Sequence, residues 1–247
     1  MDQPPPELSI VIPAYNEERR LPETLRRVRE YLSTRPASAE VIVVDDGSSD
    51  RSAAVVEEWR SKFAGLRLLS NGRNRGKGYS VRHGMLEARG RIVLFTDADL
   101  SAPIEEADKL LAALGGYEVA IGSRGVDPSL IEVHQSPLRE LAGKVFNAVV
   151  RAVTGLDFTD TQCGFKAFVR EHARIVFEQQ RIERFGFDPE ILFLAKRHGL
   201  RAIEIPVRWA HDPQTKVNMI RDSLRMFGEV LAIRWNWLLG RYPKQRQ

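Results

Sequence analysis

The stretch Arg91-Ile92-Val93-Leu94-Phe95-Thr96-Asp97-Ala98-Asp99-Leu100 is a short apolar run that ends in two aspartates one residue apart. Ile92 to Phe95 has the length and the β-branched content of a buried strand, and the chain turns polar at Thr96. Asp97 and Asp99 are therefore expected at a strand's carboxyl end, where open α/β sheets bind ligands. Two such carboxylates repel each other unless they share a cation. A Mg²⁺ or Mn²⁺ ion bound to substrate phosphates is the first interpretation, and an acidic turn that caps the next helix is the second.

Composition allows one large α/β domain and excludes several kinds of site. With 247 residues, 43% of them hydrophobic, the chain can bury a substantial core without division into two domains. A formal charge of +4 and a pI near 9.3 suit a phosphate-rich ligand, an anionic membrane surface or a nucleic acid, without choosing among them. The single cysteine, Cys163, excludes an internal disulfide and a cysteine-based zinc site. We find no signal peptide and no run of about 18 apolar residues, so no membrane-spanning segment is expected.

Apolar runs alternate with helical spacings through the first half of the chain. Strands are predicted at 8–13, 40–44 and 66–69 as well as at 92–95, with a helix after each of the first three. This alternation predicts a doubly wound, mostly parallel sheet with flanking helices. The Gly-x-Gly-x-x-Gly motif is absent after the first strand, and so is the phosphate-loop motif Gly-x-x-x-x-Gly-Lys-Ser/Thr elsewhere, which argues against a dinucleotide site and a P-loop.

The second half of the chain predicts three further helices and two strands. A strand is expected at 117–121, and strand-like alternation recurs at 201–209. A continuous apolar face predicts a helix over 137–154, and another helix is expected from Phe187 through Leu194. The tail from Met219 to Leu239 has the spacing of an amphipathic helix.

Several polar motifs follow the predicted strands in one order, and that order resembles the family-2 inverting glycosyltransferases, which have the glycosyltransferase-A fold. The stretches that carry this resemblance are Ile12–Glu17, Val44–Ser48, Asn74–Gly78 and Asp97–Asp99. The second half resembles the dolichyl-phosphate β-glucosyltransferase branch of that family, in Thr96–Pro103, Gly122–Arg124, Asp160–Lys166, Phe187–Glu190 and Ile205–Trp209.

The resemblance covers nearly the whole chain and implies how it is divided. A single glycosyltransferase-A domain is expected over 8–242, after a disordered N-terminus at 1–7. Within that domain, 8–100 would be the nucleotide-binding half and 101–218 the acceptor half. The amphipathic helix at 219–240 would follow and lie at a membrane interface.

The resemblance also implies a nucleotide-sugar site at the ends of the first strands. Its residues would be Pro13, Ala14, Tyr15, Glu17, Asp45, Asp46, Arg75, Lys77 and Asp97. Asp46, or Asp45 in its place, would accept a hydrogen bond from the base, and a buried carboxylate would reject a base that lacks the donor. Arg75 and Lys77 would neutralise the diphosphate, although a solvated surface loop explains the same residues. Asp97 and Asp99 would hold the metal, with Asp99 as the direct ligand and Asp97 shared with the ribose side.

An acceptor site is implied in the second half. Arg124, Arg139, Gln162 and Lys166 would contact the phosphate of the acceptor, since guanidinium is a bidentate donor for such a group. His134 lies near this set in the sequence and is expected to be a surface histidine. The residues assigned to catalysis are Asp99, Arg124 and Asp188. Asp188, like Glu190, is open to three interpretations: a base, a group that positions the acceptor, or a helix cap.

The expected function is inverting transfer of glucose from UDP-glucose to a polyprenyl phosphate of the dolichyl type, giving polyprenyl phosphate β-glucose, with Mg²⁺ or Mn²⁺ as cofactor. The alternatives are a GDP-mannose donor, a soluble hydroxyl acceptor, and a non-enzymatic module that binds nucleic acid or an anionic membrane. Carboxylates at strand ends argue against the last, because they would repel polyanions unless bound to metal. Nucleic acid is therefore not an expected partner, and a homo-oligomer is left open.

A polyprenyl phosphate acceptor has to be met at a membrane. Other members of the branch often carry a transmembrane anchor, and no such anchor is recognised here. We therefore expect a cytoplasmic protein that is peripheral on the cytoplasmic membrane face. The helix at 137–154 and the tail helix, with Trp235 and Trp237, would lie in the interface, and packing of their apolar faces on the core is the alternative.

Overall fold

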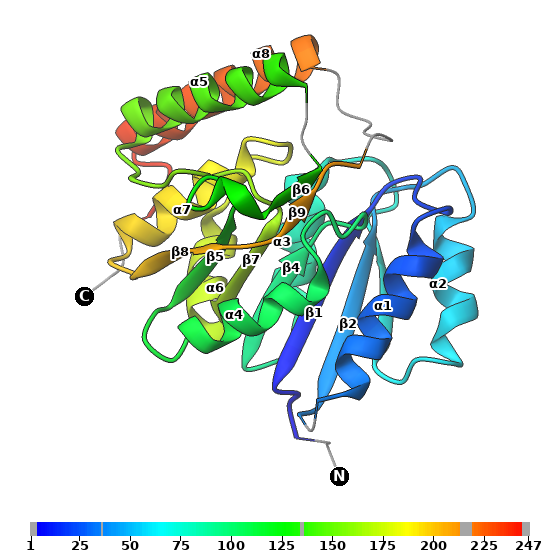
Figure 1. Ribbon diagram of the computed structural model, residues 1–247. Helices are drawn as coiled ribbons and strands as arrows, with labels where there is room; N and C mark the ends of the chain where they lie inside the picture. Colours follow the sequence, from blue (N-terminus) through cyan, green and yellow to red (C-terminus); the bar gives the residue numbers. More distant parts are fainter. Residues whose placement is uncertain (1–3, 36, 134–135, 213–218, 244–247) are drawn as a thin grey trace.

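The computed structural model describes residues 4–35, 37–133, 136–212 and 219–243, and its main feature is one seven-stranded sheet (Figure 1). The strand order is β3-β2-β1-β4-β7-β5-β8. The bounds are β1 Leu8–Ala14, β2 Ala39–Asp45, β3 Leu66–Ser70, β4 Ile92–Thr96, β5 Val119–Ser123, β7 Phe165–Val169 and β8 Ala202–Pro206. A second, two-stranded sheet pairs β6 (Ile131–Val133) with β9 (Trp209–Ala210).

Helices cover both faces of the large sheet. Their bounds are α1 Leu21–Ser33, α2 Ser52–Arg60, α3 Lys77–Glu87, α4 Ala107–Ala113, α5 Pro137–Thr154, α6 Arg170–Gln179, α7 Phe187–Arg197 and α8 Met219–Leu238, with 3₁₀ turns at Ile104–Glu106 and Pro128–Leu130. Ile10 and Ile12 of β1 face a core completed by α1, α2 and α4. Val11 faces the opposite core, which α3, α6 and α7 complete. Alternate residues of one strand are thus buried on opposite faces, which explains why its sequence is a continuous apolar run.

The prediction of a mostly parallel, doubly wound sheet is confirmed, with one antiparallel strand that was not predicted. β7 lies between β4 and β5 and is antiparallel to both, while the other neighbouring strands are parallel. Its residues fall within and just after the motif Asp160–Lys166, where no alternating pattern marks a strand. The register pairs Thr96 with Phe165, and this brings Gly164 to the end of β4 beside Asp97. The helix α6, which follows β7, was not predicted either.

The strand order creates a switch point beside β1. β2 and β3 follow on one side of β1, whereas β4 lies on its other side. The crossovers therefore leave β1 in opposite directions, and a crevice opens at the carboxyl ends of β1 and β4. Pro13, Ala14 and Asp97 all lie at this edge.

Helices α5 and α8 pack against each other and lie side by side at the upper left of Figure 1. The helix predicted at 137–154 has those bounds in the structure, and the tail helix begins and ends within one residue of its prediction. Val230 and Ile233 of α8 are fully buried. Within the described residues, no helix is both long and apolar enough to cross a membrane.

Candidate functional site

The loops that follow β1 and β2 are locked together by side-chain caps on backbone N–H groups. Asn16 N donates to Ser48 Oγ at 2.9 Å, and Glu17 N donates to Ser52 Oγ at 2.7 Å. Asp50 accepts from the backbone N–H of Ser52 at 2.9 Å at the start of α2. The polar residues after β2 therefore fix the backbone that forms one wall of the crevice.

Asp46 organises the glycine-rich loop. Its Oδ1 accepts from Asn71 Nδ2 at 2.8 Å and from Arg75 N at 2.9 Å, and its Oδ2 accepts from Gly76 N at 2.8 Å. Gly76 adopts a φ of 111°, which favours glycine, immediately before α3. The carboxylate is 3% exposed, so these bonds satisfy a group that would otherwise be buried at high cost. The predicted contact of Asp46 with a base stays a prediction, and the structure places its carboxylate within the loop that carries Lys77.

The two cations predicted for the diphosphate are used differently. Lys77 lines the crevice, and its Nζ lies 2.5 Å from Asp97 Oδ1. Burial lowers the pKa of Lys77, but the charges of Asp97 and Asp188 outweigh that effect and raise it. Arg75 lies outside the lining of the cavity, because its guanidinium pairs with Glu183 at 2.5 Å and stacks 3.5 Å above the ring of Tyr79.

Asp97 is enclosed on its other side by Gly164. A Cβ at Gly164 would lie 2.1 Å from Asp97 Oδ2 and 2.6 Å from its Cγ, so a larger residue here would require the side chain of Asp97 to move. Asp99 is held by Ser101, whose backbone N–H donates to Oδ1 at 2.9 Å. Leu100, which lies between Asp99 and Ser101, has a φ of 47°. This conformation is uncommon for a branched residue and tightens the turn that presents both aspartates. Burial and the charge of Asp97 raise the pKa of Asp99.

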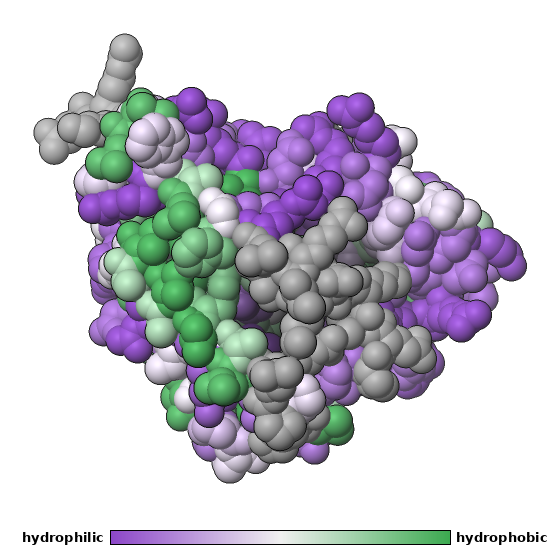
Figure 2. Space-filling view, turned by 90° about the horizontal axis from the view of Figure 1, so that it is seen from above, coloured by the Kyte–Doolittle hydropathy of each residue, from purple (hydrophilic) through white to green (hydrophobic). Residues whose placement is uncertain are grey.

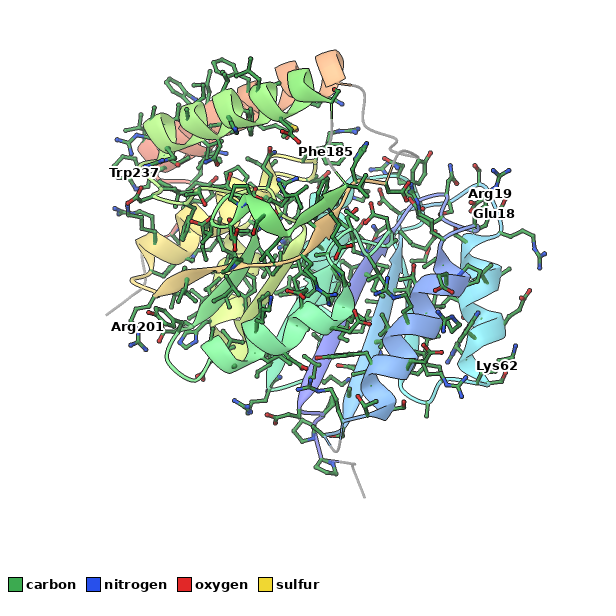
Figure 3. The ribbon with its side chains drawn as sticks, in the orientation of Figure 1. Glu18, Arg19, Lys62, Phe185, Arg201 and Trp237 are labelled. Atoms are coloured by element: carbon green, nitrogen blue, oxygen red, sulfur yellow. The ribbon has the colours of Figure 1, made fainter. Side chains whose placement is uncertain are left out.

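Together these elements form a cavity of about 250 Å³ at the switch point. Of the predicted donor residues, its lining contains Pro13, Ala14, Tyr15, Glu17, Asp46, Lys77, Asp97 and Asp99, and it does not contain Asp45 or Arg75. Arg184 and Phe185 also line it, so the second half of the chain closes a site predicted within the first; Figure 3 labels Phe185 just beneath the helices α5 and α8.

The oxygen ligands that this cavity offers fit a hard divalent metal ion. Asp97 and Asp99 offer carboxylate oxygens, the ligand type that Mg²⁺ and Mn²⁺ prefer. Across 4–35, 37–133, 136–212 and 219–243, no cluster of three or more His, Cys, Asp or Glu is arranged to hold a metal. Phosphate oxygens and water would therefore complete the coordination.

A second cavity, of about 220 Å³, is lined by residues of the second half of the chain, where the acceptor site was predicted. Arg124 lines it and forms a bidentate pair with Asp160, with Nε at 2.6 Å from Oδ2 and Nη2 at 2.9 Å from Oδ1. Burial raises the pKa of Asp160, but the charge and hydrogen bonds of Arg124 bring it down to about 2. The guanidinium also lies 5.2 Å from the ring centre of Trp209. Arg124 is therefore fixed in position, and its charge is balanced.

The rest of this lining partly matches the prediction. Gln162 belongs to it, as expected, together with residues of α5 that no motif marks: Glu140, Gly143, Lys144 and Asn147. Their spacing, i, i+3, i+4 and i+7, is that of one helix face, and this spacing in the sequence could have shown that they lie together. Arg139 lies on α5, but its side chain is outside the described residues, as is His134.

Lys166 and Asp188 form a buried ion pair, and neither of them lines either cavity. Lys166 is fully buried and also donates to the backbone oxygen of Cys163 at 2.7 Å, so it lies outside the cavity lined by Arg124 and Gln162, with which it was expected to contact the acceptor. Burial raises the pKa of Asp188, against the opposing charges of Lys166 and Lys77. The pair thus lies within electrostatic reach of the first cavity, and the charge of Asp188 also raises the pKa of Arg124 beside the second cavity.

Glu190 holds two segments of the chain together through hydrogen bonds. Its carboxylate accepts from the backbone N–H groups of Arg181 and Ile182 and from the hydroxyl of Tyr242, at 3.0, 2.9 and 2.7 Å. Burial raises its pKa to about 6 despite these bonds. Glu190 therefore ties the C-terminal segment to the turn before α7, and it lines neither cavity.

Comparison with known proteins agrees with this geometry. The model of the family described as Glycosyl transferase family 2 matches residues 9–174. The dolichyl-phosphate beta-glucosyltransferase of Drosophila melanogaster is 37% identical over 253 residues, which cover 97% of this chain and 78% of the relative. The protein of the same name from Homo sapiens is 34% identical over the same shares of both chains.

Solved structures show the same fold at lower identity. Glucosyl-3-phosphoglycerate synthase from Mycobacterium tuberculosis in complex with UDP superposes with a TM-score of 0.65 at 20% identity, over 93% of this chain and 80% of that one. The same enzyme in complex with Mn²⁺, UDP and glucosyl-3-phosphoglycerate gives a TM-score of 0.64 at 20% identity, over 97% and 82%. The sheet is accordingly that of the glycosyltransferase-A fold. The chain belongs to glycosyl transferase family 2, and within that family it resembles the dolichyl-phosphate β-glucosyltransferases.

Proposed function

We propose that this protein transfers glucose from UDP-glucose to a polyprenyl phosphate, with inversion at the anomeric carbon and with the help of Mg²⁺ or Mn²⁺. The relatives named dolichyl-phosphate beta-glucosyltransferase support the acceptor class and the sugar. The neighbours of the same fold solved with UDP and Mn²⁺ support the donor nucleotide and the ion. The single observation that carries the proposal is the arrangement of the site: a cavity with two carboxylates and a lysine, and a second cavity walled by a helix whose adjacent face is apolar and exposed.

The first cavity would bind the donor. Tyr15 lines it with 41% of its surface exposed, and its ring would stack on the base. Lys77 would turn from Asp97 to the diphosphate, where its charge opposes the charge that grows on the departing UDP. A divalent ion held by Asp99 and Asp97 would supply Lewis-acid stabilisation of the same leaving group.

The second cavity would bind the acceptor. A phosphate acceptor carries its own negative charge near neutrality, so its oxygen can attack without a general base. This agrees with the state of Asp188, whose carboxylate is 4% exposed and paired with Lys166. We therefore assign Asp188 a positioning role: it keeps Lys166 and the neighbouring charges in place between the two cavities.

A membrane surface would present this acceptor. Figure 2 shows an apolar strip along the part of the molecule where α5 and α8 lie. Its exposed residues are Leu141 and Val145 of α5 and Phe227, Leu231, Trp235 and Leu238 of α8. Trp237, which was expected at the interface with Trp235, instead packs edge-on against Phe193, and the cations of Arg197 and Arg234 lie over its ring. Peripheral binding by this strip would place the second cavity near the lipid phosphates.

The activity is tested with matched substrates. Purified protein with Mg²⁺ is given labelled UDP-glucose or GDP-mannose, and as acceptor either polyprenyl phosphate in vesicles or 3-phosphoglycerate. We expect label in the lipid from UDP-glucose, in a β-linked product. Transfer to the soluble acceptor alone, or transfer of mannose alone, would overturn the proposal. Trp235→Glu is expected to weaken binding to vesicles while leaving UDP binding unchanged, because Trp235 is 62% exposed and outside both cavities.

A further inference from the structure

We infer that Lys144 is the cation that binds the phosphate of the acceptor, and that α5 is the element that aligns a lipid phosphate with the site. This inference rests on the proposed function and names a residue that no sequence motif marks. Lys144 lies in the lining of the second cavity, on the same face of α5 as Asn147 and Gly143.

The charges of the second cavity single out Lys144. Among the described residues, its lining contains two cations, Arg124 and Lys144. Arg124 gives two of its N–H groups to Asp160, and both groups stay ionised, so the pair contributes little net charge toward an anion. Lys144 forms no ion pair with any residue in the described part of the chain, whereas Glu140, one helical turn earlier, is already engaged in an interaction. Among the described residues of this lining, Lys144 is therefore the cation without a paired carboxylate.

The two faces of α5 also match the two parts of a lipid phosphate. Glu140 and Lys144 line the cavity, and Leu141 and Val145 each follow one of them by one residue, which is about 100° around the helix. Leu141 is 59% exposed and Val145 is 57% exposed, on the apolar strip. A phosphate bound at Lys144 would thus lie one helix face away from the surface over which its isoprenoid chain would run. A soluble phosphate ester would use the cavity and leave the strip bare.

The test separates the acceptor from the donor. In Lys144→Met, the KM for polyprenyl phosphate should rise roughly tenfold or more, because a charge-assisted hydrogen bond is lost. The KM for UDP-glucose should stay within about twofold of wild type, as Lys144 is outside the donor cavity. Lys144→Arg keeps the charge and should restore most of the acceptor affinity. A merely structural role would change both KM values or kcat and would not be rescued by arginine.

A matched control carries the same substitution far from the site. Lys62 lies at the end of α2 away from α5 and α8, as Figure 3 shows, and it lines neither the donor nor the acceptor cavity. Lys62→Met removes one positive charge from the surface and should leave both KM values unchanged. An equal rise of the acceptor KM in Lys62→Met would mean that net charge, rather than Lys144, attracts the lipid.

Two arms distinguish the lipid headgroup from free phosphate. Inorganic phosphate should compete weakly with polyprenyl phosphate in wild type and compete less in Lys144→Met. Polyprenol lacks the phosphate, so any competition by polyprenol should be the same in wild type and in Lys144→Met. If wild type transfers glucose to the lipid and Lys144→Met keeps the wild-type acceptor KM, the inference is wrong and the proposed function stands. If wild type uses no polyprenyl phosphate, both are wrong.

Discussion

Replacing Gly164 with alanine tests whether the position of Asp97 controls the donor site. The added Cβ would lie 2.1 Å from Asp97 Oδ2, whereas ordinary contact begins at 3.4 Å, so the carboxylate has to move by at least 1.3 Å. Before the donor binds, the ion pair of Oδ1 with Lys77 at 2.5 Å restrains this shift. Backbone shift is also restricted, since β7 begins at the next residue and is paired with β4 through Phe165 and Thr96.

A displacement of about 1 Å in a catalytic group can cost about a hundredfold in rate. We expect kcat/KM of Gly164→Ala to fall by about that factor and its affinity for UDP with Mn²⁺ to weaken. Overpacking should lower the free energy of unfolding by about 1 to 3 kcal/mol, which leaves a folded protein to assay. The matched control is Gly116→Ala, where a Cβ would meet nothing within 4 Å.

The assay combines initial rates of lipid glucosylation, calorimetric titration of UDP and Mn²⁺, and urea unfolding of both variants. We expect Gly164→Ala to lose far more activity than its loss of stability explains. Gly116→Ala should have the activity of wild type. A Gly164→Ala protein with kcat/KM within twofold of wild type would refute this prediction, because the reaction would then not depend on the position of Asp97.

Three further outcomes are expected. Lys77→Met should weaken UDP binding by roughly tenfold in calorimetry, because the charge that would meet the diphosphate is gone; unchanged affinity would contradict its role. Chelation with EDTA should abolish transfer, and added Mg²⁺ or Mn²⁺ should restore it; full activity in EDTA would count against the metal. Tyr242→Phe should lower the free energy of unfolding by about 1 to 2 kcal/mol at pH 7, because Glu190 loses a hydroxyl donor at 2.7 Å. The folded pKa of Glu190, about 6, exceeds its ordinary 4.5, so stability falls as pH rises through that window. Losing the donor raises this pKa further, so urea unfolding should show a larger loss at pH 7 than at pH 5, and an equal loss at both would contradict the assignment.

Several of the predicted site residues line one cavity where a strand end supplied them. Asp97, Asp99 and Pro13 directly follow or end apolar strands, and parallel strands bring those ends to one edge of a sheet. The prediction was less complete where a residue lies in a loop or a helix. Arg75 is held outside the first cavity by Glu183 and Tyr79. Lys144 lines the second cavity, and no sequence motif marks it.

By itself, the sequence determined the alternation of strands and helices, the edge of the sheet that carries the aspartates and, through its motifs, the family. These follow from periodicity and local order, which a linear chain records directly. Only the tertiary structure decided which charges are balanced: Lys77 by Asp97, Arg124 by Asp160 and Lys166 by Asp188. The partners in each pair are 20 to 36 residues apart, and an antiparallel strand inserted between β4 and β5 sets Lys166 among them. Whether a charged group is free to bind a ligand depends on such contacts in space, and spacing along the chain does not specify them.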